Sequence, residues 1–76
     1  HGLGLGLHER PIISRLNSLE DPVEIQAGMV FALETYCPAT DGFSAARIEE
    51  EVVVAPDGAR ILTLFPSQEL FIANAY

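Results

Sequence analysis

The chain has 76 residues, of which 49% are hydrophobic, so it suits one small folded unit and is too apolar for a disordered chain. A formal net charge of −7 argues against nucleic acid or an anionic membrane as a partner, because those surfaces require clustered lysine and arginine. The lone Cys37 excludes an internal disulfide and favours a reducing, cytoplasmic location, and no apolar run is long enough for a membrane span.

Residues 1–8 alternate leucine with glycine between two histidines, a period of two that predicts a strand with one bare face. The bare face either packs against another backbone or leaves room for a substrate or metal. Regular alternation would point His1 and His8 to opposite faces. Both serve one site only if the chain bends before His8, which the glycines permit. Each histidine alone is more often structural than functional.

The next stretch predicts loops and one short helical turn. Pro11 excludes a central strand, and residues 14–21 are polar. Asp21 followed by Pro22 is typical of a helix start, so a helical turn is expected over residues 22–26. Gly28 then ends this turn.

Two strand-like segments, residues 29–34 and 46–54, flank an Asp41–Gly42 dipeptide that is a strong signal for a hairpin turn. A reversal at that dipeptide places Glu34 directly opposite Glu49, on the same face of the sheet. Pro38 indicates a loop longer than two residues. A symmetric widening of the loop preserves this pairing, whereas a bulge destroys it.

Two carboxylates that face each other repel, so one of them must be protonated or a cation must lie between them. Our interpretation is a metal ion. The alternative for the run Glu49–Glu51 is a solvated acidic edge, although apolar residues flank the run. Arg47 shares the face of Glu49 and is able to neutralise a neighbouring carboxylate. Nothing near Cys37 in the sequence activates it as a nucleophile.

The last part of the chain predicts a second reversal and a short helical turn. Residues 55–58 have the composition of a β-turn that leads into a strand over residues 60–64. Residues 66–70 are expected to form one helical turn with Ser67 as its cap.

Four segments, HGLGLGLHE, GMVFALE, ARIEEEVVV and PDG, together resemble the C-terminal part of the pita-bread metallopeptidases. This family includes prolidase, aminopeptidase P, methionine aminopeptidase and the non-peptidase creatinase, and the prolidase-like branch is the most similar. The resemblance runs from His1 to about Thr63. It implies an α+β fold, a curved antiparallel sheet with helices on its convex side. Residues 1–76 are then expected to be a C-terminal fragment of the catalytic domain, mostly strands with little helix.

The resemblance also implies roles for individual residues and a pair of divalent metal ions (Mn, Co, Zn or Fe). His1, Glu34 and Glu49 are similar to metal ligands, with Glu49 as the bridging carboxylate. Glu34 would also carry a proton. His8 is similar to the histidine that binds substrate and the tetrahedral intermediate, and Arg47 to an arginine that supports the site.

Two further aspartate ligands of that family lie upstream of the histidine, and Asp21, Asp41 and Asp57 do not match them. The 76 residues alone are therefore expected to bind metal poorly and to lack activity. The implied reaction is hydrolysis of Xaa-Pro or N-terminal peptide bonds by a metal-activated water, in a homodimer. The alternatives are a non-peptidase enzyme on small molecules (a dimethylsulfoniopropionate lyase or a creatinase-like hydrolase) and a non-catalytic fragment. Residues 34–38 depart from the Glu-Pro of many prolidase-like members, which leaves the substrate class open.

Overall fold

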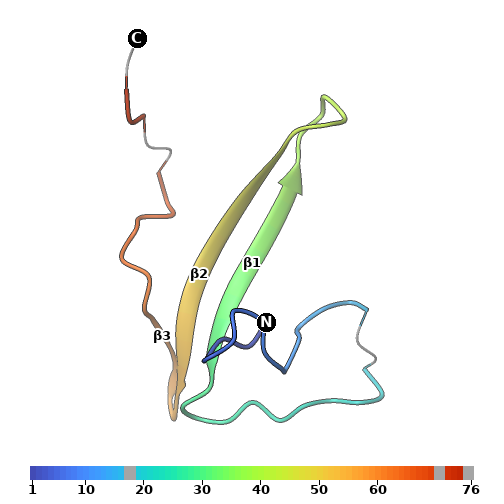
Figure 1. Ribbon diagram of the computed structural model, residues 1–76, viewed down its shortest axis with the longest axis vertical. Helices are drawn as coiled ribbons and strands as arrows, with labels where there is room; N and C mark the ends of the chain where they lie inside the picture. Colours follow the sequence, from blue (N-terminus) through green and yellow to red (C-terminus); the bar gives the residue numbers. More distant parts are fainter. Residues whose placement is uncertain (17–18, 70–71, 75–76) are drawn as a thin grey trace.

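A computed structural model describes residues 1–16, 19–69 and 72–74, and its regular structure is one antiparallel sheet (Figure 1). The strands are β1 (Val30–Pro38), β2 (Ala45–Ala55) and β3 (Gly58–Ile61), in the spatial order β1-β2-β3. Antiparallel strands with little helix are what the sequence predicts. Within the described ranges, no helix has the length and hydrophobicity that crossing a membrane requires.

The β1–β2 hairpin has the predicted register, with Glu34 paired to Glu49. Its loop spans residues 39–44, longer than two residues, and it widens symmetrically so that Pro38 pairs with Ala45. Gly42 has a φ of 85°, a left-handed conformation that glycine adopts without strain. Asp41 accepts hydrogen bonds from the backbone N–H groups of Phe43 and Ser44, at 3.1 and 2.9 Å.

The second reversal also forms, and Ala55 pairs with Gly58. The strand that follows is Gly58–Ile61, so it begins and ends earlier than the expected residues 60–64. Leu62 still donates its N–H to the Glu51 carbonyl at 2.7 Å. Beyond it the Thr63 hydroxyl, and not a backbone carbonyl, accepts the Glu51 N–H at 2.6 Å. The regular ladder therefore stops because a side chain takes the place of the backbone acceptor.

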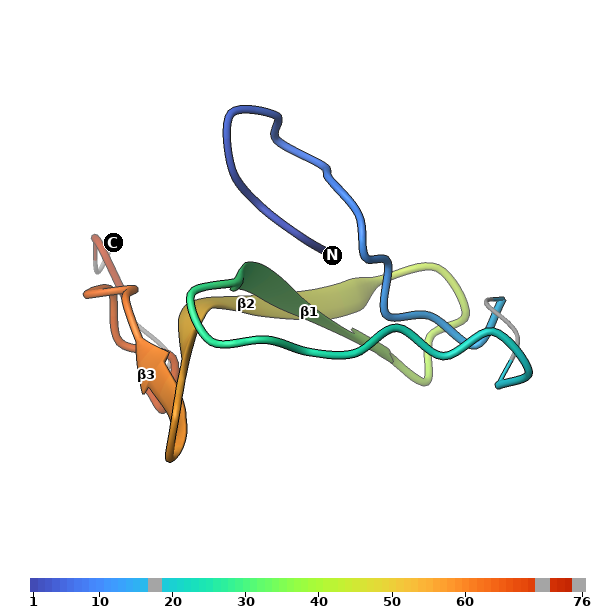
Figure 2. The ribbon, with the colours of Figure 1, turned by 90° about the horizontal axis from the view of Figure 1, so that it is seen from below.

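The N-terminal segment does not form the regular strand expected over residues 1–8. Gly2 lies beside the free edge of β1, where it pairs with Phe31, and it also pairs with Glu9 across a loop. Residues 4–8 bend between these two pairings. Figure 2 shows this loop, in blue, rising beside the two long strands. Gly4 and Gly6 lie within this bend, whereas Gly2 lies in the paired part of the segment.

The two expected helical turns are wrong. Residues 22–26 are extended and exposed, and residues 66–69 form bends; Leu70 lies outside the described residues. Helical segments this short need packing partners to form, and these segments have little to pack against. The C-terminal segment instead runs along β2 (Figure 1), where the Ser67 hydroxyl donates to Glu50 Oε1 at 2.6 Å.

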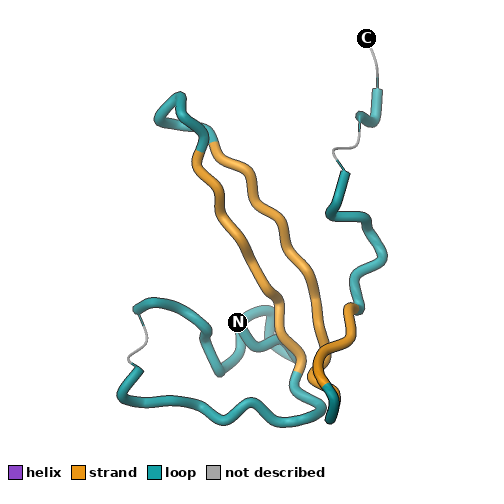
Figure 3. Tube along the Cα trace, turned by 180° about the vertical axis from the view of Figure 1, so that it is seen from behind, coloured by secondary structure: helices purple, strands orange, loops and turns teal. Residues whose placement is uncertain are grey.

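The buried hydrophobic core of the described chain is small and consists of Phe31, Ala32 and Val52. It lies where residues 1–3, β1, β2 and β3 come together (Figure 3). Leu33 and Ile48, further along the hairpin, are exposed. The hairpin is therefore covered only near the start of β1, because no second layer lies against the rest of it in the described chain.

Candidate metal centre

The register of the hairpin brings two carboxylates together on one face. Glu34 of β1 lies directly across from Glu49 of β2. A hydrogen bond between the two side chains lowers the pKa of Glu34, and the same bond raises the pKa of Glu49. A proton taken up by the pair is therefore held preferentially by Glu49. Such proton sharing is the alternative to a metal ion that the sequence offers.

His1 reaches this pair through backbone pairing with β1. The backbone carbonyl of His1 accepts the Ala32 N–H at 2.9 Å, and the backbone nitrogen of His1 donates to the Ala32 carbonyl at 3.0 Å. Ala32 precedes Glu34 by two residues, so the His1 ring lies on the carboxylate face. The ring Nε2 is 3.3 Å from Glu34 Oε1, and the His1 side chain is only 10% exposed.

The contacts of the His1 ring define where a cation is needed. Nδ1 is 2.9 Å from the Gly2 carbonyl, which only accepts, so Nδ1 carries a proton. The other nitrogen, Nε2, then turns its lone pair towards a carboxylate oxygen. Two electron-rich atoms at this distance require a proton or a metal ion between them. In agreement, the hydrogen bond to Gly2 raises the pKa of His1, and Glu34 raises it further, against desolvation.

His8 comes to the same place because the N-terminal loop folds back. The pairing of Gly2 with Glu9 sets His8 opposite Leu3, which is on the same side as His1. The ring centroids of His1 and His8 are 4.1 Å apart and the planes are tilted by 37°. One possible ligand atom from each of His1, His8 and Glu34 lies within 4.8 Å of the others. The bend on which a shared site depends is therefore present.

Arg47 lies at the solvent side of the pair. Its Nη1 is 3.7 Å from Glu34 Oε2, and its guanidinium carbon is 6.0 Å from the centre of the Tyr36 ring. The Arg47 side chain is 57% exposed. Water therefore screens most of its charge, and Arg47 adds less to the electrostatics of Glu34 than Glu49 does.

A cavity of about 370 Å³ is lined by the two histidines and the two facing glutamates, His1, His8, Glu34 and Glu49. Sequence reasoning missed two of its polar lining residues, Glu51 and Thr63. The spacing of Glu51 from Glu49 places both on one face, which is a usable signal. Thr63 gives no such signal, because it arrives through its bond to the Glu51 backbone. The full lining is His1, Leu3, Leu7, His8, Ala32, Glu34, Glu49, Glu51 and Thr63.

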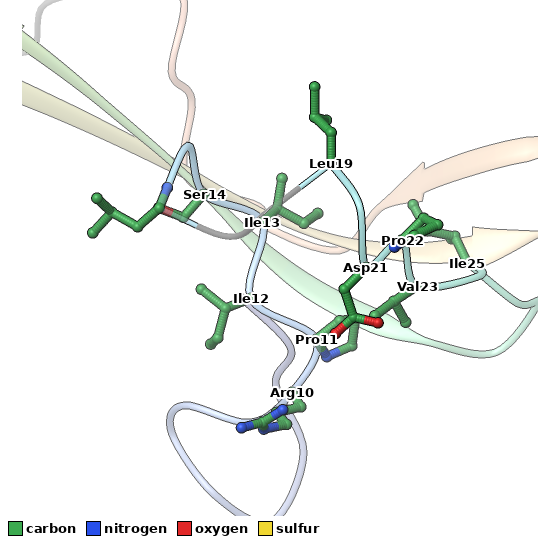
Figure 4. A pocket seen from close by; sticks show the side chains of 11 residues that line it. Arg10, Pro11, Ile12, Ile13, Ser14, Leu19, Asp21, Pro22, Val23 and Ile25 are labelled. Atoms are coloured by element: carbon green, nitrogen blue, oxygen red, sulfur yellow. The ribbon is translucent and has the colours of Figure 1, made fainter.

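The other polar residues considered from the sequence lie elsewhere. Asp41 is bound within the hairpin loop, and Asp57 lies in the turn between β2 and β3. Asp21 lines a separate hollow of about 520 Å³ within the loop of residues 10–25, where most lining side chains are apolar (Figure 4). Cys37 is exposed near the end of β1. None of the three aspartates lines the cavity that holds the histidines.

The residues present fit a divalent cation. An imidazole nitrogen with a free lone pair and two facing carboxylates form the nitrogen and oxygen donor set that Zn²⁺ and similar ions take in proteins. A cation there would offset the repulsion between the facing carboxylates Glu34 and Glu49. The contact of His1 Nδ1 with a backbone carbonyl is the outer hydrogen bond that metal-binding histidines usually make.

Known proteins resemble this chain over most of its length. The model of metallopeptidase family M24 matches residues 1–56, which include both histidines and both facing glutamates. The chain is 38% identical over 74 residues to "Putative dipeptidase YkvY" of Bacillus subtilis, covering 95% of this chain and 18% of that protein. It is 32% identical over 80 residues to methionine aminopeptidase of Escherichia coli K12, covering 84% of this chain and 30% of that protein.

A third relative, "Uncharacterized peptidase YqhT" of Bacillus subtilis, is 35% identical over 75 residues, covering 95% of this chain and 19% of that protein. The chain thus spans between 18% and 30% of the length of these three relatives. No solved structure gives a significant match. The family match covers residues 1–56, most of the chain, so the chain belongs to metallopeptidase family M24.

Proposed function

We propose that this chain is the C-terminal part of the catalytic domain of a metal-dependent peptidase that hydrolyses Xaa-Pro peptides, as a dipeptidase or an aminopeptidase. The observation that carries the proposal is the facing pair of Glu34 and Glu49 with His1 Nε2 3.3 Å from Glu34. Membership in family M24 supports peptide hydrolysis in general. The likeness of the ARIEEE segment, with Arg47, to the prolidase-like branch supports Xaa-Pro bonds as the substrate class.

His1, Glu34 and Glu49 would hold two divalent ions together with two aspartates from another part of the full-length protein. When bound, the ions supply Lewis acidity, which lowers the pKa of a water molecule and polarises the scissile carbonyl. The hydrogen bond with Glu34 raises the pKa of Glu49, so a metal ion competes with a proton for Glu49 as the pH falls. Metal binding is therefore coupled to loss of a proton from Glu49.

Glu34 is the group that moves a proton. The hydrogen bond from Glu49 lowers the pKa of Glu34, so Glu34 is a carboxylate at neutral pH. It accepts a proton from the attacking water and delivers it to the amide nitrogen that leaves. Its side chain is 32% exposed and borders the cavity, so both the water and the leaving nitrogen have access to it. After each proton transfer Glu34 must become a carboxylate again, and the neighbouring positive charge of Arg47 favours that charged form.

His8 contacts the substrate. Its ring lies against His1 and lines the cavity, but it is on the exposed side of that pair. A ring N–H there donates to the carbonyl oxygen of the substrate, where negative charge develops in the tetrahedral intermediate. Donors placed at a developing oxyanion commonly contribute about 100- to 1000-fold to the rate.

The test uses the full-length protein that contains this chain. The protein is stripped with a chelator, reloaded with Mn²⁺, Co²⁺, Zn²⁺ or Fe²⁺, and assayed on Xaa-Pro dipeptides and on longer peptides with proline second. We expect hydrolysis only after reloading, and a preference for proline over alanine at the second position. Full activity in the stripped protein, or bound metal with no cleavage of any peptide tested, would contradict the proposal.

A further inference from the structure

The loop that carries His8 is tied by one residue, Glu9. The Glu9 backbone N–H donates to the Gly2 carbonyl at 2.8 Å, which closes the base of the loop. The Glu9 side chain turns back into the loop, where its Oε1 accepts the Gly6 N–H at 2.6 Å. Glu9 is the last residue of the loop. Its backbone bonds Gly2 at the start of the loop, and its side chain bonds Gly6 on the far side.

The glycines of the loop make room for this carboxylate. A Cβ atom at Gly4 would lie 2.5 Å from Glu9 Oε2, and one at Gly6 would lie 3.1 Å from Glu9 Cγ. The space beside Gly4 and Gly6 is thus filled by the Glu9 side chain, whereas a Cβ at Gly2 would meet the backbone carbonyl oxygens of Arg10 and Glu9, at 2.5 and 2.8 Å. A side chain at position 4 would displace the carboxylate, because the carboxylate is the flexible end of Glu9.

Besides these bonds, the tip of the loop has one backbone hydrogen bond, in which the Gly4 N–H donates to the Gly6 carbonyl at 3.2 Å. Leu5 is fully exposed and Leu7 is largely exposed, so neither anchors the loop by burial. His8 directly precedes Glu9, and its ring reaches His1 only while the loop is folded back. The position of the His8 ring therefore depends on the bond between the Glu9 carboxylate and Gly6.

We propose that Glu9 is a positioning residue: its carboxylate ties the far side of the loop of residues 2–9 to the base and so holds His8 against His1 at the mouth of the cavity. The expected effect on kcat rests on the proposed peptidase function, whereas the expected effect on the position of the His8 ring does not. In the peptidase, Glu9 would act through His8 on the tetrahedral intermediate and would leave the ligands His1, Glu34 and Glu49 in place.

The experiment compares Glu9→Ala, Glu9→Gln and Gly4→Ala in the full-length, metal-loaded protein. We expect Glu9→Ala to lower kcat by about 10- to 100-fold, the usual cost of losing a group that orients an active-site residue. Its KM and bound metal content should stay within about twofold of the parent. Glu9→Gln keeps an acceptor oxygen of the same shape and should restore most of kcat. Gly4→Ala should reproduce Glu9→Ala, although Glu9 itself is unchanged.

The second measurement does not depend on activity. Crystal structures of the parent and the three variants give the separation of the His1 and His8 rings, 4.1 Å between centroids here. We expect this separation to persist in Glu9→Gln and to be lost in Glu9→Ala and Gly4→Ala. Leu5→Ala, at the exposed tip of the same loop, is the matched control and should change neither measurement.

The outcomes separate the two proposals. An unchanged ring separation in both Glu9→Ala and Gly4→Ala would overturn the positioning role, whatever the enzyme does. Loss of the ring contact in a protein that cleaves no peptide would support the positioning role and count against the peptidase. A fall in kcat that Glu9→Gln does not rescue would also contradict the role, because it would assign the effect to charge and not to the hydrogen bond.

Discussion

The carboxylates and the imidazoles of the candidate centre are brought together in different ways. Glu34 and Glu49 come from one hairpin, whose loop at residues 39–44 fixes their pairing through local contacts. His1 and His8 come from a loop that must first fold back on itself and then pair with the other edge of β1. The carboxylate half therefore depends on a nearby turn, and the imidazole half on contacts between residues far apart in the chain.

This difference leads to different behaviour when each half is altered. The two carboxylates are held in register by a ladder of nine residue pairs, so the loss of one side chain leaves the other in place. The His8 ring is held by a few bonds of one exposed loop. Changes in the hairpin should thus act through chemistry, whereas changes in the loop should act through position.

The largest effect is expected from removal of a carboxylate. In the full-length protein, Glu49→Ala should lower kcat/KM by at least about 100-fold and weaken metal binding, because direct ligands contribute no less than the outer groups that orient them. The measurements are peptide hydrolysis and metal content after dialysis. Glu24→Ala, which removes an exposed loop carboxylate of equal charge, is the control. Similar activities in the two variants would show that Glu49 is not a ligand.

The carboxylate pair could be predicted from the sequence, whereas the histidine pair could not be predicted in full. The Asp41–Gly42 signal gives the turn, and the strict alternation of strands then gives the face that Glu34 and Glu49 share. The sequence predicts that His1 and His8 meet only if the chain bends before His8, because the Leu-Gly alternation by itself indicates a strand. The group that fills the glycine face, Glu9, is not marked by any periodicity.

The errors in the fold have the same origin. Asp21–Pro22 and Ser67 are good local signals for helix starts, yet no helix forms over residues 22–26 or 66–69. Cap signals contribute only when the following residues have a surface on which to pack. Local patterns thus predicted the β1–β2 hairpin and its register, while the strand expected over residues 1–8 and the two helical turns, whose formation depends on tertiary contacts, were wrong.

The second effect is a dependence of metal binding on pH, to which both halves contribute. Hydrogen bonding to the Gly2 carbonyl raises the pKa of His1 above 6.5, and the bond to Glu34 raises the pKa of Glu49 above 4.5. A metal must displace both protons. Affinity should therefore fall by about tenfold per pH unit once the pH drops below the raised pKa of His1, and more steeply below that of Glu49.

Glu34 should not add to this dependence in the same range, because its bond with Glu49 lowers its pKa below 4.5. Calorimetric titration of the stripped full-length protein with Zn²⁺, in two buffers of different ionisation enthalpy, counts the protons released. We expect release of a proton at pH 6 in the parent. Affinity that is constant between pH 5 and pH 8 would mean that neither proton competes with the metal.

A smaller effect tests whether the hairpin turn sets stability without setting chemistry. Gly42→Ala places a Cβ at a φ of 85° and should cost about 1–2 kcal/mol of unfolding free energy. The ladder should hold Glu34 and Glu49 in register, so activity per folded molecule should not change. Urea unfolding of the full-length protein measures the first and kcat the second. Thr40→Ala, at an exposed position of the same loop, should change stability by less than about 0.5 kcal/mol.

The smallest effect is expected at Arg47, and it separates two sources of the charge on Glu34. If the facing Glu49 keeps Glu34 ionised, Arg47→Ala should lower kcat/KM by less than about fivefold, because the arginine is 57% exposed and its contact is screened. Arg47→Lys should then be indistinguishable from the parent. Tyr36→Phe keeps the ring beside the guanidinium and serves as the control. A 100-fold loss in Arg47→Ala would show that the arginine, and not Glu49, keeps Glu34 ionised. It would also mean that the exposed edge of the hairpin is covered in the full-length protein.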